Sequence, residues 1–134
     1  MQEAQNTQTI QDMYAAFGRG DVPTLLNLLD EAVVWYPVKG AAKTVPTAGE
    51  RRGKAAVAEF FRLLAEGTTW EAFEPQEFIA ERDKVVARGR YAAVAKPTGR
   101  RYASDWVMIF TLRAGKVVGF EEFCDTAALN AAWA

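Results

Sequence analysis

The chain has 134 residues, of which 50% are hydrophobic and 25% are charged, and its 16 basic and 17 acidic side chains nearly cancel. This length and composition predict one globular domain over residues 1–134, and the net charge of −1 gives no electrostatic reason to expect nucleic acid or an anionic membrane surface as a partner. The absence of histidine excludes Ser-His-Asp and Cys-His nucleophile systems and removes the commonest transition-metal ligand.

Acid–base chemistry must therefore come from Asp, Glu, Tyr, Lys or the single thiol of Cys124. We expect neither a metal ion nor an organic cofactor. No basic segment followed by an apolar run resembles a secretory signal, and no apolar run approaches the ~20 residues of a membrane span. The location expected by default is the cytoplasm.

The first half of the chain is predicted to be mostly helical. Apolar residues recur at helical spacing over 9–19, 21–30 and 53–66, and glycines follow the first and third of these three N-terminal helices. A short strand at 32–37 ends at a proline and leads into a loop over 38–52. This loop is long for a compact domain, so we expect it to form a lid or rim.

The second half is predicted to form strands. Strands are expected at 70–80 and 85–95, and two more within 102–126 are joined by a tight turn at 113–116. Successive strands joined by short turns pair antiparallel. The sequence therefore predicts an α+β fold, with helices gathered on one face of a curved sheet and a short helical turn at 127–134.

The strand at 102–112 has two apolar faces. One face carries Tyr102, Ser104, Trp106, Met108 and Phe110, and the other carries Ala103, Asp105, Val107, Ile109 and Thr111. A sheet covered by helices on one side should have a solvated outer face. We interpret the face with Trp106, Met108 and Phe110 as the outer one, which predicts a homodimer through it.

The pairing across the last turn places two acids together. If Leu112 pairs with Val117, Asp105 lies opposite Cys124 and becomes a diagonal neighbour of Glu122, roughly 5 to 8 Å away. Both carboxylates then point toward the face of the sheet that the helices cover. This arrangement makes Asp105 and Glu122 the candidate catalytic pair.

Two interpretations of the acidic pair stay open. On an apolar wall, repulsion and desolvation would raise the pKa of one carboxyl, so that it could act as an acid or base near neutral pH. Alternatively, both carboxylates lie at a solvated rim, or Arg88 or Arg90 neutralises them.

Four strings in the expected order resemble the NTF2-like superfamily, specifically the SnoaL-like and ketosteroid-isomerase-related proteins. They are YAAFGRGD at 14–21, RGKAAVAEFF at 52–61, TGR at 98–100 and GKVVGFEEFCDT at 115–126. The resemblance implies a cone-shaped fold, in which a curved antiparallel sheet wraps around a helix-lined pocket. It also implies a dimer through the back of the sheet.

The catalytic residues of ketosteroid isomerase do not carry over. Met13, Tyr36 and Val107 stand where the isomerase has its tyrosine, its basic Asp and its neutral Asp. We therefore do not expect steroid isomerisation by that mechanism.

The resemblance implies which other side chains face the pocket. The candidate ligand-binding residues are Tyr14, Tyr36, Phe60, Tyr91, Val107, Ile109, Phe120 and Cys124. Each has a structural alternative: Tyr14 can be a core residue with a satisfied hydroxyl, and Cys124 a small buried apolar residue.

These observations leave several functions open. One is cofactor-free proton transfer, cyclisation or hydration of a small hydrophobic carbonyl compound by Glu122 and Asp105, in the manner of a SnoaL-like isomerase or cyclase. Another is a non-catalytic module that binds an apolar ligand in the same cone. A third is a regulatory dimer with no small ligand.

Overall fold

The computed structural model describes residues 2–134. Its helices are α1 (Gln2–Gly18), α2 (Val22–Asn27), α3 (Lys54–Gly67) and α4 (Thr126–Trp133). Its strands are β1 (Leu29–Tyr36), β2 (Arg51–Arg52), β3 (Thr68–Glu81), β4 (Lys84–Ala95), β5 (Arg100–Arg113) and β6 (Lys116–Cys124). Within residues 2–134, no helix combines the length and apolar character needed to cross a membrane.

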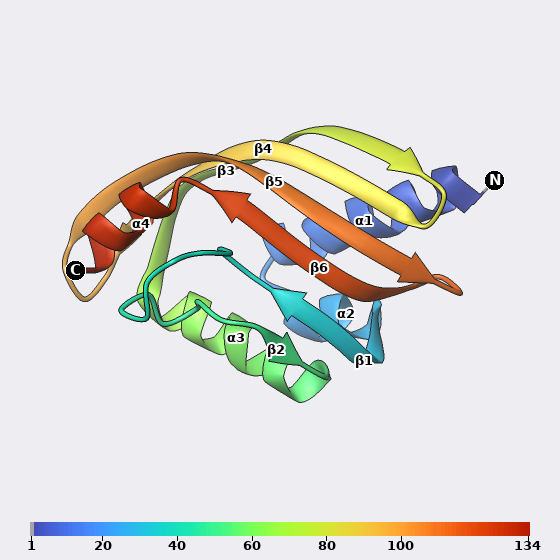
Figure 1. Ribbon diagram of the computed structural model, residues 1–134, viewed down its shortest axis with the longest axis horizontal. Coiled ribbons are helices and arrows are strands. Elements are labelled where there is room, and N and C mark those ends of the chain that lie inside the picture. The colour runs from blue at the N-terminus through green and yellow to red at the C-terminus, as the bar shows by residue number, and fades with distance from the viewer. Residues whose placement is uncertain (1) are drawn as a thin grey trace.

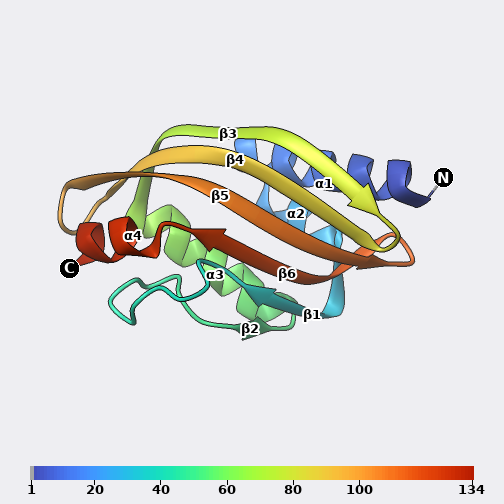
Figure 2. The same cartoon turned by 45° about the horizontal axis from the view of Figure 1, so that its top comes forward.

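One curved sheet organises the molecule. Its strand order is β2-β1-β6-β5-β4-β3, and all neighbours are antiparallel except β1 and β6, which are parallel. Figure 1 shows the long strands arching over α1, α2 and α3, and Figure 2 shows α4 at the end of the sheet opposite the β3–β4 and β5–β6 turns. The predicted α+β class, with the helices on the concave face, is confirmed.

Some boundaries differ from the predicted ones. The first helix begins at Gln2 rather than near residue 9. Its first turns are mostly polar and lack an apolar pattern, but Gln, Glu and Ala have high helix propensity. The second helix ends at Asn27, and β1 starts at Leu29 instead of residue 32. Asp21 caps the second helix, since its carboxylate accepts a hydrogen bond from the Thr24 amide at 3.2 Å.

A β-bulge in the last hairpin changes the register expected there. Leu112 pairs with Val117 as predicted, but Thr111 pairs with Gly119, so Val118 is an extra residue in β6. Beyond the bulge, Met108 lies opposite Glu122. A slip of one residue moves every following side chain to the other face of the sheet.

The predicted faces of β5 are therefore interchanged. Trp106 and Phe110 are 1% exposed and Met108 is 7% exposed. All three side chains lie on the concave face of the sheet, in the core that it forms with the helices. The predicted dimer surface through these three residues is wrong, because their side chains belong to the core of the monomer. Asp105 and Val107 point outward instead, and Val107 is 38% exposed.

The position of Trp106 depends on a glycine in the neighbouring strand. Gly89 lies directly opposite Trp106. A Cβ atom at Gly89 would lie 2.6 Å from Trp106 Cζ2 and would also overlap the Glu74 carbonyl oxygen. The close approach of β3, β4 and the indole is therefore possible only without a side chain at this position.

Candidate functional site

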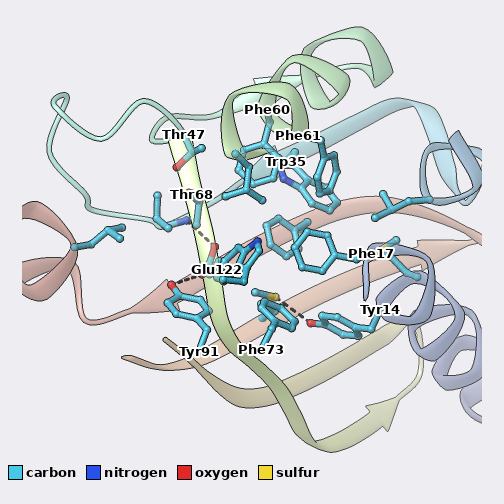
Figure 3. A pocket seen from close by; sticks show the side chains of 18 of the residues that line it. Tyr14, Phe17, Trp35, Thr47, Phe60, Phe61, Thr68, Phe73, Tyr91 and Glu122 are labelled. Atoms are coloured by element: carbon cyan, nitrogen blue, oxygen red, sulfur yellow. Dashed lines mark hydrogen bonds between the residues drawn. The ribbon is translucent and has the colours of Figure 1, made fainter. Parts of the chain in front are cut away.

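The concave face of the sheet and the helices enclose a pocket with a volume of about 80 Å³. Its walls are mainly aromatic. Figure 3 shows Trp35, Phe60 and Phe61 on one side and Phe73 and Tyr91 on the other, with Glu122 between them. Since a water molecule occupies about 30 Å³ and drug-sized ligands need roughly 300 to 1,000 Å³, the pocket as it stands accommodates a small group, and a larger ligand must displace wall side chains.

Glu122 is the acidic group of this pocket. It lies on β6, is 5% exposed, and its Oε1 accepts a hydrogen bond from the Val38 amide at 3.2 Å. Its Oε2 lies 2.8 Å from the hydroxyl of Tyr91. Burial raises the pKa of the Glu122 carboxyl, although the hydrogen bonds from Tyr91 and Val38 partly oppose this shift. Within residues 2–134, no lysine or arginine forms an ion pair with Glu122.

Tyr91 is the side-chain hydrogen-bond donor to this carboxyl. Tyr91 lies on β4 and is 4% exposed. Burial and the adjacent Glu122 both raise the pKa of its phenol, so the hydroxyl stays neutral. When Glu122 is ionised, the Tyr91 hydroxyl donates to it; when Glu122 is protonated, the carboxyl can donate and the phenol can turn its proton toward a ligand.

The backbone at Val38 holds the second hydrogen bond in place. Val38 has φ 38°, in the left-handed region that a β-branched residue rarely adopts. Such a conformation costs on the order of 1–3 kcal/mol and persists where the surrounding structure enforces it, often at functional sites. Here it directs the Val38 amide at Glu122, and the following Lys39 amide donates to the Glu122 backbone carbonyl at 2.9 Å.

Tyr14 reaches the pocket from α1. Its hydroxyl donates a hydrogen bond to Met108 Sδ at 2.9 Å, and its ring stacks on Trp106 with centroids 5.8 Å apart. Burial raises the pKa of its phenol, with a contribution from Glu122. Tyr14 is therefore a second neutral hydroxyl on the pocket wall.

The structure brings together some of the candidate residues and separates others. Those that line the pocket are Tyr14, Phe60, Tyr91, Phe120 and Glu122. Asp105, Val107 and Ile109 lie on the other face of β5, so their predicted inward orientation is wrong, and the cause is the bulge at Val118. Among residues 2–134, no second carboxylate therefore lines the pocket beside Glu122.

Two further candidates, Tyr36 and Cys124, do not line the pocket. Tyr36 is half-buried on β1 and pairs with Glu121, and the Lys39 ammonium lies 5.1 Å from its ring centroid. The half-buried Cys124 follows Glu122 by two residues. Burial, together with Glu122, raises the pKa of the Cys124 thiol to about 11, so it stays protonated and is no nucleophile at neutral pH.

Sequence reasoning missed several wall residues. The most important of them are Trp35, Val38, Thr47, Trp70, Phe73 and Met108. The alternation of side chains between the two faces of β1 could have identified Trp35. Val33 and Trp35 share the buried face of this strand, whereas Tyr36 points to the other face. Val38 and Thr47 belong to the 38–52 segment, which was expected to form a lid or rim, but its lack of periodicity gave no means of telling which of its residues line the pocket.

Comparisons with known proteins extend over nearly the whole chain. A family model described as a SnoaL-like domain matches residues 10–120. An NTF2-like protein from Burkholderia xenovorans LB400 is 34% identical with a TM-score of 0.89. The match covers 100% of this chain and 99% of that protein. An NTF2-like protein from Burkholderia thailandensis E264 is 27% identical with a TM-score of 0.86. The match covers 96% of this chain and 97% of that protein.

A third similar structure is of a protein co-crystallized with a named compound. TerC, co-crystallized with polyporic acid, is 26% identical with a TM-score of 0.82, covering 96% of this chain and 98% of TerC. No curated protein sequence matches the chain.

Proposed function

We propose that this chain, which belongs to the SnoaL-like family of NTF2-like proteins, binds a small hydrophobic molecule in its pocket and transfers protons on it through Glu122 without a cofactor. One observation carries the proposal: a buried carboxyl without a cationic partner in residues 2–134 faces an aromatic pocket. The crystallisation of TerC with polyporic acid supports a small organic molecule as the ligand class.

The chemistry follows from the groups on the wall. Among the described side chains that line the pocket, Glu122 is the only carboxylic acid. Its raised pKa brings it nearer to the neutral range, in which a group both accepts and returns a proton efficiently. The aromatic walls bind an apolar ligand and exclude water, which strengthens polar contacts inside the pocket.

A carbonyl compound with an acidic α-proton fits this arrangement. The Glu122 carboxylate would remove the α-proton, the electron pair of that C–H bond would form the C=C bond of an enolate, and the π pair of the carbonyl would move onto its oxygen. The proton would then return from Glu122 to the same or another carbon, and the carbonyl would form again. Once Glu122 has taken the proton, the Tyr91 hydroxyl no longer has to donate to it and can donate a hydrogen bond to the enolate oxygen. Isomerisation and carbon–carbon ring closure both begin with this step.

The test is exchange of α-protons in deuterated water, followed by NMR with phenylacetone as a small enolisable probe. The protein should accelerate exchange, and Glu122→Gln, which keeps the shape of the side chain, should lower the acceleration at least ~100-fold, as loss of a general base does. Asp105→Asn is the matched control and should leave the rate unchanged, because Asp105 lies on the outer face.

A second candidate function is ligand binding without catalysis. The observation in its favour is that both oxygens of Glu122 already have partners, Val38 and Tyr91. In that case the wild-type protein would bind phenylacetone, yet exchange would be no faster than in buffer.

We also propose that the chain forms a homodimer through the outer face of the sheet. Val107 and Phe123 pair directly across β5 and β6 and are 38% and 41% exposed. Arg88 lies opposite Val107 on one side, and Glu121 and Asp105 lie nearby on the same face. A two-fold interface would bury the apolar pair Val107 and Phe123 of one copy against the same pair of the other.

A further inference from the structure

The indole nitrogen of Trp35 is a buried donor with no partner. Trp35 is 3% exposed and lines the pocket, and its Nε1 finds no hydrogen-bond acceptor within residues 2–134. Folded proteins leave few buried donors unpaired, and each exception requires an explanation.

Packing prevents the indole from turning toward another acceptor. The ring stacks on Phe120 with centroids 3.9 Å apart and planes at 20°. Phe60 and Phe61 contact it from the helix side, with centroid distances of 6.0 and 5.7 Å. The donor therefore stays in the wall, on the side shown with Phe60 and Phe61 in Figure 3.

The register of the sheet places Trp35 and Glu122 near each other. Trp35 on β1 pairs directly with Phe120 on β6, and Glu122 lies two residues further along β6 on the same face. Two residues along a strand span roughly 6 to 7 Å. Trp35 and Glu122 therefore belong to the same part of the pocket wall.

We propose that Trp35 Nε1–H donates a hydrogen bond to an acceptor oxygen of the ligand, and that this bond selects oxygen-bearing ligands over hydrocarbons of the same shape. The oxygen is a carbonyl, or the enolate oxygen that forms from it during proton transfer. Trp35 is thus a specificity residue. This inference rests on the proposed function, since it requires the pocket to be the ligand site.

The test compares two probes that differ in one group. Acetophenone and α-methylstyrene have the same shape, but the first has a carbonyl oxygen where the second has a methylene carbon. Wild-type protein should bind acetophenone about tenfold more tightly than α-methylstyrene in equilibrium dialysis, as one buried hydrogen bond provides. Trp35→Phe, which keeps an aromatic ring, should abolish this preference by weakening acetophenone alone.

Trp106→Phe is the matched control. Trp106 is also buried, and its Nε1 also lacks a partner in the described residues, but it does not line the pocket. This variant should keep the tenfold preference. A preference that survives in Trp35→Phe would overturn the inference while leaving the proposed function intact, whereas failure of the wild-type protein to bind either probe would overturn both.

A measurement on the unmodified protein covers the case in which Trp35→Phe does not fold. Addition of acetophenone should move the Trp35 indole ¹H–¹⁵N NMR signal downfield, and α-methylstyrene should not. Equal shifts with the two probes would contradict the hydrogen bond.

Discussion

At the scale of single residues, the site depends on the surroundings of Glu122. The carboxyl is buried, and hydrogen bonds from Tyr91 and Val38 are its polar contacts within the described chain. The sequence predicted that Glu122 faces inward, because strand alternation and the resemblance agreed on this position. It could not predict that Val38 and Tyr91 are its partners, since these contacts span 84 and 31 residues and arise only from the fold.

Burial of Glu122 predicts how stability depends on pH. Its folded-state pKa is raised, so the folded protein keeps a proton that the unfolded chain loses as the pH rises. The contribution of Glu122 to stability is therefore most favourable below its unfolded pKa and falls as the pH rises toward and through its folded pKa. Glutamine does not titrate, so the stability of Glu122→Gln relative to wild type should increase as the pH rises above the ordinary glutamate value of 4.5. Urea unfolding at several pH values measures this difference, and a difference that decreases with pH would contradict the assignment.

At the scale of elements, the β5–β6 hairpin determines which residues enter the pocket. The turn and the pairing of Leu112 with Val117 were predicted correctly, but the extra residue Val118 was not. A bulge leaves little trace in a sequence, because one residue changes the register without changing the alternation on either side. A burial argument could have found it, since the observed register buries Trp106 and exposes Asp105, whereas the predicted one does the opposite.

The packing of β3, β4 and β5 predicts a strong effect of one substitution. Gly89→Ala should lower the free energy of unfolding by about 2–3 kcal/mol, because the added methyl group overlaps the Glu74 carbonyl oxygen and the Trp106 ring. Gly18→Ala is the control. It has no atom within 4 Å of its new Cβ and lies at the end of α1, so it should be neutral or slightly stabilising. Equal effects of the two substitutions in urea unfolding would show that the close approach at Gly89 does not limit stability.

At the scale of the whole molecule, the order of helices and strands was predictable, and the closure of the cone was not. The spacing of apolar residues and the turn-forming residues between segments identified the three N-terminal helices and the four long strands. The parallel pairing of β1 with β6 joins residues 85 to 88 positions apart, and no local pattern encodes it. This pairing places Trp35 beside Phe120, so it also forms one wall of the pocket.

The proposed dimer is a property of the complete sheet. Val107→Glu and Phe123→Glu should each convert a dimer to a monomer in sedimentation at micromolar concentration, because each places an unpaired charge in an apolar interface. Ile79→Glu is the matched control: Ile79 is 56% exposed but lies next to the β3–β4 turn, so the dimer should persist. A wild-type protein that sediments as a monomer would exclude this assembly.

The pH profile of phenylacetone α-proton exchange tests the central claim, that Glu122 is the acid–base group of the pocket, most directly. The rate with wild-type protein should rise with pH as Glu122 ionises, through a midpoint above the ordinary glutamate value of 4.5, because burial raises its pKa. The rate with Glu122→Gln should stay close to that of buffer at every pH. Equal profiles for the two proteins would contradict the claim.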